Sequence, residues 1–434
     1  MLIAKPGLEP FRLRAGEVSI VSVAPSEEIK NEAPSITRRR LILRDSLTFL
    51  SLTLVTVALF LVTLFLFRTF AAHRTELGRR WSDRGRAALT AGKPEQAIRA
   101  LRTALSYTPG ERTYELLLAQ ALAEGRHTDE AYFYFTGLWD TEPGDGFVNL
   151  QLARLAAARK EQGQAVNFYR ASIFGTWQGD GVLRRRNVRL ELARYLLDRD
   201  DLPAARAELL IAEGNADNDP ALDLELGHLF EQAGDRADAL EAYRKAAEAG
   251  PMDPAPPAAA GRLAYSMGEF ATAQKFLAQA VRAEQAVRAK GSLQQQSPAA
   301  SPPSTDVTEL LKNSERILAI FPSRRLSPER RVARLLDLKT VVRKRLESCA
   351  SSLPNGLPAE LQELNAAWNS TGKATGNSTG KATRALLLRD ENRQDDLLQL
   401  IYDTEVNADK RCGTATGDDA LVVILSRHPG SVEK

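Results

Sequence analysis

From about residue 78 onward, this chain of 434 residues repeats itself with a period near 34 residues. One position of each unit is always a small residue, namely Gly85, Ala119, Ala153, Ala193, Gly227 and Gly261. Twelve residues later comes an alanine: Ala97, Ala131, Ala165, Ala205, Ala239 and Ala273. Four residues beyond that comes a bulky side chain: Leu101, Phe135, Tyr169, Leu209, Tyr243 and Leu277. A period of this length is typical of arrays in which each unit is one pair of helices.

The spacing of small and bulky positions has a physical meaning. Small residues let two antiparallel helices approach closely, and we expect the bulky residue to fill the space between one hairpin and the next. A single hairpin cannot bury its apolar face, so at least three stacked units are needed, and here there are about six. Between the third and fourth units the step is 40 residues, which indicates an insertion around residues 179–184.

The pattern resembles the tetratricopeptide repeat family over residues 78–287, about half of the chain. The first unit matches that family's signature at Trp81, Gly85, Ala88, Ala97, Leu101, Ala104 and Pro109. The fifth matches it at Leu226, Gly227, Ala239, Tyr243, Ala246 and Pro251. The fourth unit departs from the family because it lacks the closing proline. The resemblance implies a right-handed α-solenoid whose concave groove binds an extended peptide or a partner helix, which is scaffolding and not catalysis.

Residues 47–67 form an apolar segment without a charge, amide, glycine or proline. Its 21 residues span a bilayer core of roughly 30 Å at about 1.5 Å per residue. Its serine and threonine hydroxyls can bond to the helix's own carbonyls. A cleaved signal peptide fits poorly, because the stretch is long and about 45 residues precede it. The segment therefore predicts a transmembrane helix that contacts the lipid bilayer.

Residues 1–45 contain several prolines and mixed charge, which predicts a disordered N-terminal tail. Arginines flank the apolar segment equally on both sides, so the local positive-inside count is a tie. Further basic residues in the tail favour a cytoplasmic N-terminus, and two cysteines in the C-terminal part suit an oxidising compartment. Together with a composition rich in alanine and arginine, this predicts a single-pass protein of a bacterial inner membrane with its repeats in the periplasm.

The position directly after each small residue is mostly basic. It holds Arg86, Gln120, Arg154, Arg194, His228 and Arg262. By analogy with the family, these side chains would line the concave surface as a ladder. Arginine forks bind carboxylates bidentately, so an acidic segment or a free C-terminus is the natural ligand. The alternative is that these are solvated positions whose arginines pair with neighbouring glutamates.

The last third begins with residues 288–306, which are rich in Gln, Ser and Pro and predict a linker. Residues 307–434 predict a small helical region. It includes a basic amphipathic helix that begins near Ser327 and either lies on an anionic membrane or docks on its own domain. Residues 369–383 are a tandem copy that predicts a flexible loop. Its Gly-Lys pairs do not match a phosphate-binding loop, because Ala374 and Ala382 stand where a Ser or Thr is required.

Both cysteines, Cys349 and Cys412, lie in this C-terminal region. A disulfide between them would close a loop of about 60 residues and contribute about 3–4 kcal/mol by the loop-entropy relation. Two isolated buried thiols are the alternative.

The remaining composition narrows the function classes. A net charge of +3 gives no reason to expect nucleic acid as a partner. The four histidines are scattered, and no nucleophile–base pair, paired acidic motif or metal-ligand spacing stands out, so we expect no catalytic, cofactor or metal site. The sequence thus predicts a membrane-tethered, all-α scaffold that binds a protein or peptide partner. The alternatives are a self-associating structural component of a membrane complex and, less favoured, an enzyme with a novel C-terminal domain.

Overall fold

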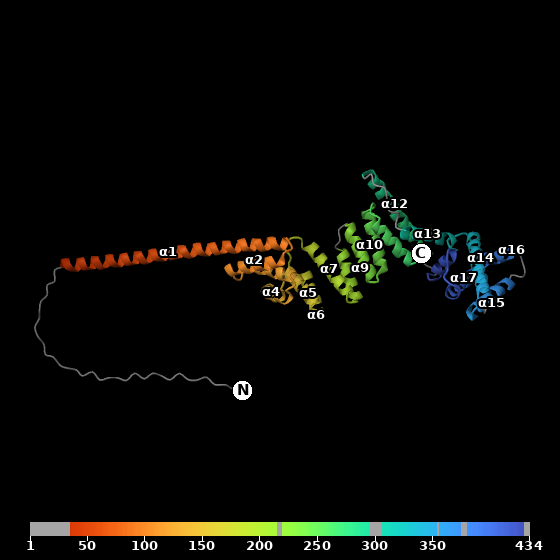
Figure 1. Cartoon of the computed structure of the whole chain (residues 1–434), viewed down its shortest axis with the longest axis horizontal. Coiled ribbons are helices and arrows are strands. Elements are labelled where there is room, and N and C mark those ends of the chain that lie inside the picture. Colours follow the sequence, from red (N-terminus) through yellow and green to blue (C-terminus); the bar gives the residue numbers. More distant parts are fainter. Residues whose placement is uncertain (1–34, 215–218, 295–304, 354–355, 375–379, 429–434) are drawn as a thin grey trace, which may run out of the picture.

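The computed structural model describes residues 35–214, 219–294, 305–353, 356–374 and 380–428. Within these ranges the regular structure is helical, with one isolated bridge between Asp145 and Thr176. A long N-terminal helix leads into an array of stacked helix pairs, and a compact group of helices lies at the opposite end of the molecule (Figure 1). The predicted all-α solenoid of paired helices is confirmed.

Six helix pairs make up the array. They are α1 (Ser35–Thr90) with α2 (Pro94–Tyr107), α3 (Arg112–Glu124) with α4 (Thr128–Thr141), α5 (Gly146–Ala158) with α6 (Gln162–Phe174), α7 (Gly181–Leu197) with α8 (Leu202–Gly214), α9 (Pro220–Gln232) with α10 (Arg236–Ala249), and α11 (Ala255–Ser266) with α12 (Phe270–Gln294). Each pair coincides with one unit of the 34-residue frame, and the end of α1 supplies the first helix of the first pair.

The periodic positions of the sequence form the core of every pair. All six small residues of the first helices are buried, and so are the alanines and bulky residues of the second helices. A Cβ atom added to Gly85 would lie 2.5 Å from Cγ of Leu101, and one added to Gly261 would lie 2.6 Å from Cγ of Leu277. In these pairs the bulky residue therefore packs directly onto the small residue of its own hairpin. We had expected it to fill the space between one hairpin and the next.

The turn inside each pair uses one left-handed residue at a constant position. These residues are Gly92, Arg126, Lys160, Asp200, Gly234 and Gly268, all with φ between 59° and 79°. Glycine adopts this conformation without a steric penalty, which explains the three glycines. The other three units hold the same conformation with a side chain present, so stacking of the array overrides the local preference.

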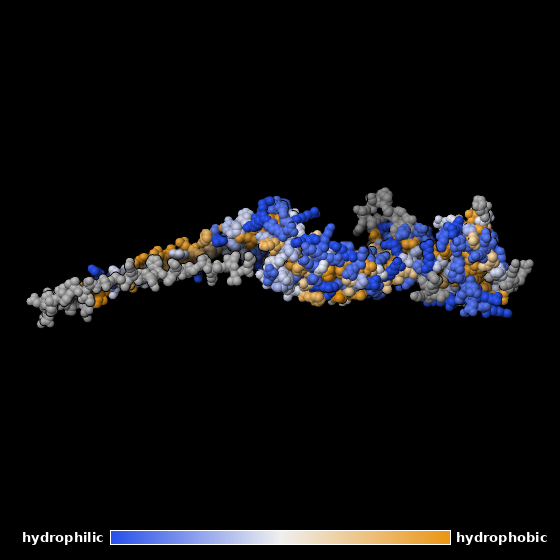
Figure 2. Space-filling model, turned by 90° about the horizontal axis from the view of Figure 1, so that it is seen from below, coloured by the Kyte–Doolittle hydropathy of each residue, from blue (hydrophilic) through white to orange (hydrophobic). Residues whose placement is uncertain are grey.

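Helix α1 has 56 residues and is about 84 Å long at 1.5 Å per residue. Residues 41–72 are exposed on all sides, and Figure 2 shows apolar surface along this part of α1. Hydroxyls such as those of Thr53 and Thr56 bond to carbonyls four residues earlier, each at 2.8 Å, as expected. Among the described residues, α1 alone has the length and hydropathy of a membrane span. It is weak support for one, because a signal sequence near the N-terminus satisfies the same criteria.

The helix begins at Ser35, within the segment 1–45 that we expected to be disordered. Residues 35–45 contain no proline or glycine and consist largely of Arg, Leu and Ile, so the apolar helix propagates backward through them. Residues 1–34 lie outside the described part of the chain.

Helix α13 (Thr305–Ile320) covers the open face of the last pair, where Val307 packs with Ala258, Ala273 and Leu277. The terminal group follows as α14 (Pro328–Ser352), α15 (Ala359–Ala374), α16 (Gly380–Arg389), α17 (Glu391–Arg411) and α18 (Asp418–Ser426). Its core includes Trp368, Ile401 and Val422 and continues to Phe270 of α12. The terminal group is therefore packed against the array.

The structure differs from the sequence interpretation at two connections. Helix α12 continues to Gln294 and α13 begins at Thr305, so both ends of the expected linker 288–306 are helical. Within the expected loop 369–383, α15 extends to Ala374 and α16 starts at Gly380. Helix-forming residues such as Ala289, Lys290 and Gln294 explain the extension of α12. Residues 295–304 and 375–379 lie outside the described part.

The basic amphipathic helix is α14, and its apolar face docks on its own domain. Val332, Leu335, Leu338 and Leu346 are buried in the terminal core. Beside this face, the half-buried Arg334 donates to the carbonyls of Leu318 and Phe321 at 2.9 and 2.7 Å. The apolar face is thus not available to a membrane surface.

We expect Gly227→Ala to destabilise the array by about 1–3 kcal/mol, because the new methyl group would collide with the ring of Tyr243. Thermal unfolding followed by circular dichroism measures the effect. Gly137→Ala in α4 is the matched control, since no atom outside the local backbone of its own helix lies within 4 Å of the added methyl group. The control should leave stability equal or higher, by up to about 1 kcal/mol. Equal melting curves for the two variants would contradict the close-packing explanation.

Candidate functional site

The six ladder positions lie in register on the first helices of the pairs, a surface that we call the first-helix face. Five of the six side chains are exposed and Gln120 is half-buried. Two of the arginines join neighbouring pairs. Arg154 Nη2 lies 2.7 Å from Glu191 Oε2, and Arg194 forms an ion pair with Glu225.

The first of these ion pairs belongs to a small network. Tyr169 donates to the same Glu191 carboxylate at 3.0 Å. Burial alone would raise the pKa of Glu191, but the Arg154 hydrogen bond and charge hold that pKa below its ordinary value. Arg154 is therefore committed to a stacking contact between α5 and α7.

The other ladder residues behave differently from one another. The ring of His228 is hydrogen-bonded to the Tyr243 hydroxyl at 2.8 Å, and Arg262 lies 4.0 Å from an oxygen of Asp306. Arg86 has no ion pair with any residue that the structure describes. Arg154 and Arg194 thus follow the alternative prediction, in which the arginines pair with neighbouring glutamates. A continuous basic ladder that binds a ligand stays a prediction.

The insertion in the fourth unit builds a structured loop on the first-helix face. Residues 175–180 lie between α6 and α7, and α7 has 17 residues where α3, α5 and α9 each have 13. Thr176 exchanges backbone hydrogen bonds with the start of α5: Gly146 N donates to Thr176 O at 2.9 Å, and Thr176 N donates to Gly144 O at 2.8 Å. The inserted segment is therefore attached to the preceding repeat.

Two glycines make this attachment close. A Cβ atom on Gly146 would lie 2.5 Å from the Trp177 indole, and one on Gly175 would lie 2.7 Å from Cα of Gly146. The indole nitrogen of Trp177 donates to Ser172 O at 2.9 Å, and Arg185 donates to Gly175 O at 3.2 Å. These contacts hold the loop and orient Trp177.

Two cavities of about 360 Å³ each lie on the first-helix face, on either side of the start of α7. The lining of the first cavity includes Leu116, Gln120, Asp145, Phe147, Trp177 and Arg184. The lining of the second includes Arg186, Leu190, Arg194, Asp219, Leu222 and Glu225. Two predicted groove residues, Gln120 and Arg194, therefore line cavities. Trp177, Arg184 and Arg186 were not among the predicted groove residues, although the 40-residue step marks the place.

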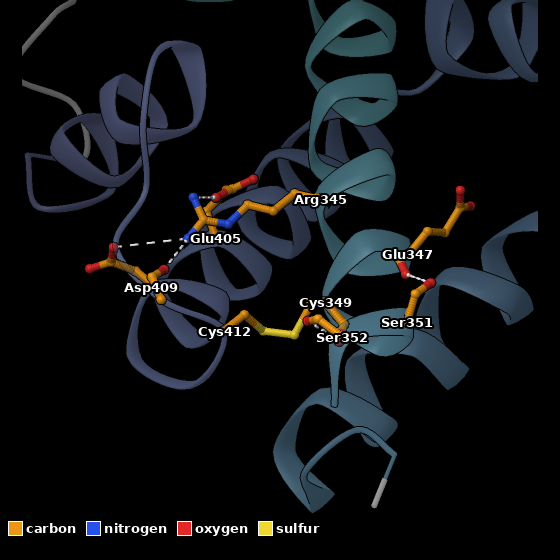
Figure 3. Close-up of a disulfide and its surroundings, with 9 residues drawn as sticks. Arg345, Glu347, Cys349, Ser351, Ser352, Glu405, Asp409 and Cys412 are labelled. Carbon is orange, nitrogen blue, oxygen red and sulfur yellow. Dashed lines mark hydrogen bonds and ion pairs between the residues drawn. A yellow bond between two sulfur atoms is a disulfide. The ribbon is translucent and has the colours of Figure 1, made fainter. Parts of the chain in front are cut away.

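A third cavity, of about 510 Å³, lies in the terminal group beside a disulfide between Cys349 and Cys412. The two Cα atoms are 5.4 Å apart, and the bond joins α14 to the residue that ends α17 (Figure 3). Of the two proposed states of these cysteines, the structure has the bonded one.

A charge cluster lies next to the disulfide. Arg345 extends from α14 toward α17, where its Nη1 is 3.3 Å from an oxygen of Glu405 and its Nη2 is 3.9 Å from Asp409 (Figure 3). Asp419 of α18 approaches the same guanidinium at 3.8 Å. Glu405 is fully buried, and neither carboxylate oxygen has a hydrogen-bond partner. Burial, with added repulsion from Asp419 and Asp409, raises the pKa of Glu405 to about 8 despite Arg345.

We expect Glu405 to make the terminal group less stable as pH rises. Its pKa is about 8 in the folded chain against an ordinary 4.5, so the folded state holds a proton that the unfolded chain has released. The stabilisation is complete below about pH 4.5 and is lost as pH rises through about 8. Glu405→Gln should remove this dependence, measured as amide hydrogen-exchange protection of α17 at pH 6 and pH 8.5. Glu363→Gln, an exposed position on α15, is the control. An unchanged pH dependence in Glu405→Gln would contradict the assignment.

No group of three or more His, Cys, Asp or Glu side chains could hold a metal ion within the ranges that the structure describes.

Comparisons with known proteins agree with the helix-pair architecture. A tetratricopeptide repeat family model matches residues 82–135 and 190–254. Comparison with curated proteins gives no match. Among solved structures, pilF of Pseudomonas aeruginosa is 19% identical, with a TM-score of 0.37 over 50% of this chain and 99% of that chain.

Two further structures have similar values. PilW, described as a type IV pilus biogenesis factor, is 15% identical, with a TM-score of 0.36 over 46% of this chain and 91% of that one. YrrB, described as a protein of the same repeat class with an unusual peptide-binding site, is 13% identical, with a TM-score of 0.31 over 39% and 85%. These values are too low for any of the three to inform the function of this chain.

Proposed function

We propose that this tetratricopeptide repeat protein is a membrane-tethered scaffold that holds a protein partner on its first-helix face. Proteins with such repeats are protein–protein interaction scaffolds. The observation that carries the proposal is the pair of cavities on that face, each lined by polar and charged side chains beside a smaller number of apolar ones. This combination suits recognition of side chains on an extended segment.

The continuity of α1 supports the tether. Helix α1 runs from the apolar segment into the first repeat without a break, and Arg74 donates to the carbonyl of Tyr107 at 2.9 Å. A tether built this way holds the array at a defined angle to the membrane, because no flexible linker separates the two. The exposed apolar surface of residues 47–67 would be covered by lipid.

The bonded cysteines support repeats that lie outside the cytoplasm, since disulfides persist in oxidising compartments. With a cytoplasmic N-terminus, the array of a bacterial inner-membrane protein would face the periplasm, and envelope proteins would be its partners.

Self-association in a membrane complex is the second candidate. Several large apolar side chains on second helices are well exposed, among them Phe133 of α4 (74%), Phe174 of α6 (80%) and Leu210 of α8 (47%). They lie outside the two cavities, so an interface between copies would leave the first-helix face free for a partner.

A photo-crosslinking residue in place of Gln120 or Asn187, both at the cavities, should form adducts with a common partner in intact cells. The same residue in place of Arg170 or Arg236, exposed on second helices, should not. Mass spectrometry of the adducts identifies the partner. Equal yields from both sets would contradict recognition by the first-helix face. Adducts that contain only this chain would favour self-association.

Labelling with a membrane-impermeant thiol reagent tests the topology. In intact cells, we expect the reagent to modify Cys349 and Cys412 only after an extracellular denaturant and reductant have unfolded the terminal group and broken the disulfide. Before that treatment the bond occupies both thiols. Thiols that stay shielded until lysis and then react without reductant would place the terminal group in the cytoplasm and reverse the proposed orientation.

A further inference from the structure

We infer that the insertion in the fourth repeat forms a carboxylate-binding site for an acidic, extended peptide segment that crosses the start of α7. This inference rests on the proposed scaffold function and names the partner's chemistry. The residues that carry it are Arg184, Arg186 and Trp177, none of which belongs to the periodic ladder.

The arginines at the start of α7 are placed at both cavities. Residues 184–186 are three consecutive arginines in the first turns of α7, and their side chains diverge. Arg184 lines the cavity next to α5, Arg186 lines the cavity next to α9, and Arg185 between them holds the loop through Gly175 O. One guanidinium is thus available at each cavity, and the middle one is structural.

The charges at the two cavities are paired unequally. The acidic residues there already have partners. Arg112 Nη2 lies 2.9 Å from Glu142 and 3.0 Å from Asp145, and Arg194 is paired with Glu225. Asp219 accepts from the backbone N–H groups at the start of α9, at 3.1 and 3.3 Å.

The arginines at the cavities have spare capacity. In the part of the chain that the structure describes, no carboxylate forms an ion pair with Arg184 or Arg186. The Arg186 Nε atom is buried without a hydrogen-bond partner, and the Arg184 guanidinium lies 5.7 Å from the Trp177 ring centroid. A guanidinium without an acidic partner has unused donors on its terminal nitrogens, and a carboxylate that enters either cavity can accept hydrogen bonds from them.

Apolar side chains lie beside each of these two arginines. Phe147 and Trp177 lie in the first cavity with Arg184, and Leu190 and Leu222 lie in the second with Arg186. An extended strand alternates its side chains. Acidic residues interspersed with apolar ones would therefore place carboxylates on the arginines and apolar groups against these walls.

The experiment uses the full chain in detergent micelles and a fluorescein-labelled dodecapeptide of alternating Glu and Leu, with fluorescence anisotropy as the readout. Two versions of the peptide, with a free and an amidated C-terminus, separate side-chain carboxylates from the terminal one. A Lys/Leu peptide of the same length is the charge control. We expect the Glu/Leu peptide to bind and the Lys/Leu peptide to bind far more weakly.

The test variant is Arg184→Gln with Arg186→Gln, which leaves the loop anchor Arg185 intact. Loss of two charge-assisted contacts should weaken binding of the Glu/Leu peptide by about tenfold or more. The matched control, Arg170→Gln with Arg236→Gln, removes the same charge from second helices and should change affinity by less than about twofold because of screening. Arg184→Lys with Arg186→Lys keeps the charge without the fork and should give an intermediate loss.

Equal binding of the two peptides, or an unchanged affinity in the Arg184→Gln, Arg186→Gln variant, would overturn the inference. If crosslinks from Gln120 and Asn187 still form in cells, the scaffold function stands and only the acidic nature of the partner is wrong. If the Glu/Leu peptide does not bind selectively and no crosslinks form from Gln120 and Asn187, the scaffold function is wrong as well.

Discussion

The hairpins whose small residue is a glycine depend on one contact, in which that glycine of the first helix meets a bulky side chain of the second. At Gly85 and Gly261 not even a Cβ atom fits without displacing Leu101 or Leu277. Because the helix axes can approach only where this contact is made, it sets the distance between helices and hence the stacking of one pair on the next. The turns adapt to that stacking, as the left-handed Lys160 illustrates.

The same stacking decides which polar groups of the first-helix face are free. Successive pairs bring Arg154 next to Glu191 and Arg194 next to Glu225, so these arginines stabilise the array. An insertion escapes the periodic pairing, because its residues have no counterpart in the neighbouring unit. This is the physical reason why Arg184 and Arg186 at the start of α7 have no acidic partner among the described residues, whereas Arg154 and Arg194 of the neighbouring ladder positions are paired.

The two ends of the array are closed in different ways. At the N-terminal end, α1 is shared between the apolar segment and the first repeat, which couples the two rigidly. At the other end, α13 covers the last pair and the terminal group packs against it. That group contains a fully buried Glu405 near one arginine and two further carboxylates. The disulfide holds α14 and α17 together across this cluster, which keeps the arginine close to the buried acid.

The sequence by itself determined the number of repeats, the residues at their cores and the apolar length of residues 47–67. These properties depend on spacing along the chain, which recurs in every unit. Only the tertiary structure decided which arginines are paired, how the loop with Trp177 attaches to Gly146, and that Glu405 is buried near Arg345. Each of those contacts joins two residues that lie tens of positions apart and occurs once in the chain, so no periodic pattern in the sequence predicts it. The energies of these contacts depend on burial and on distance in space.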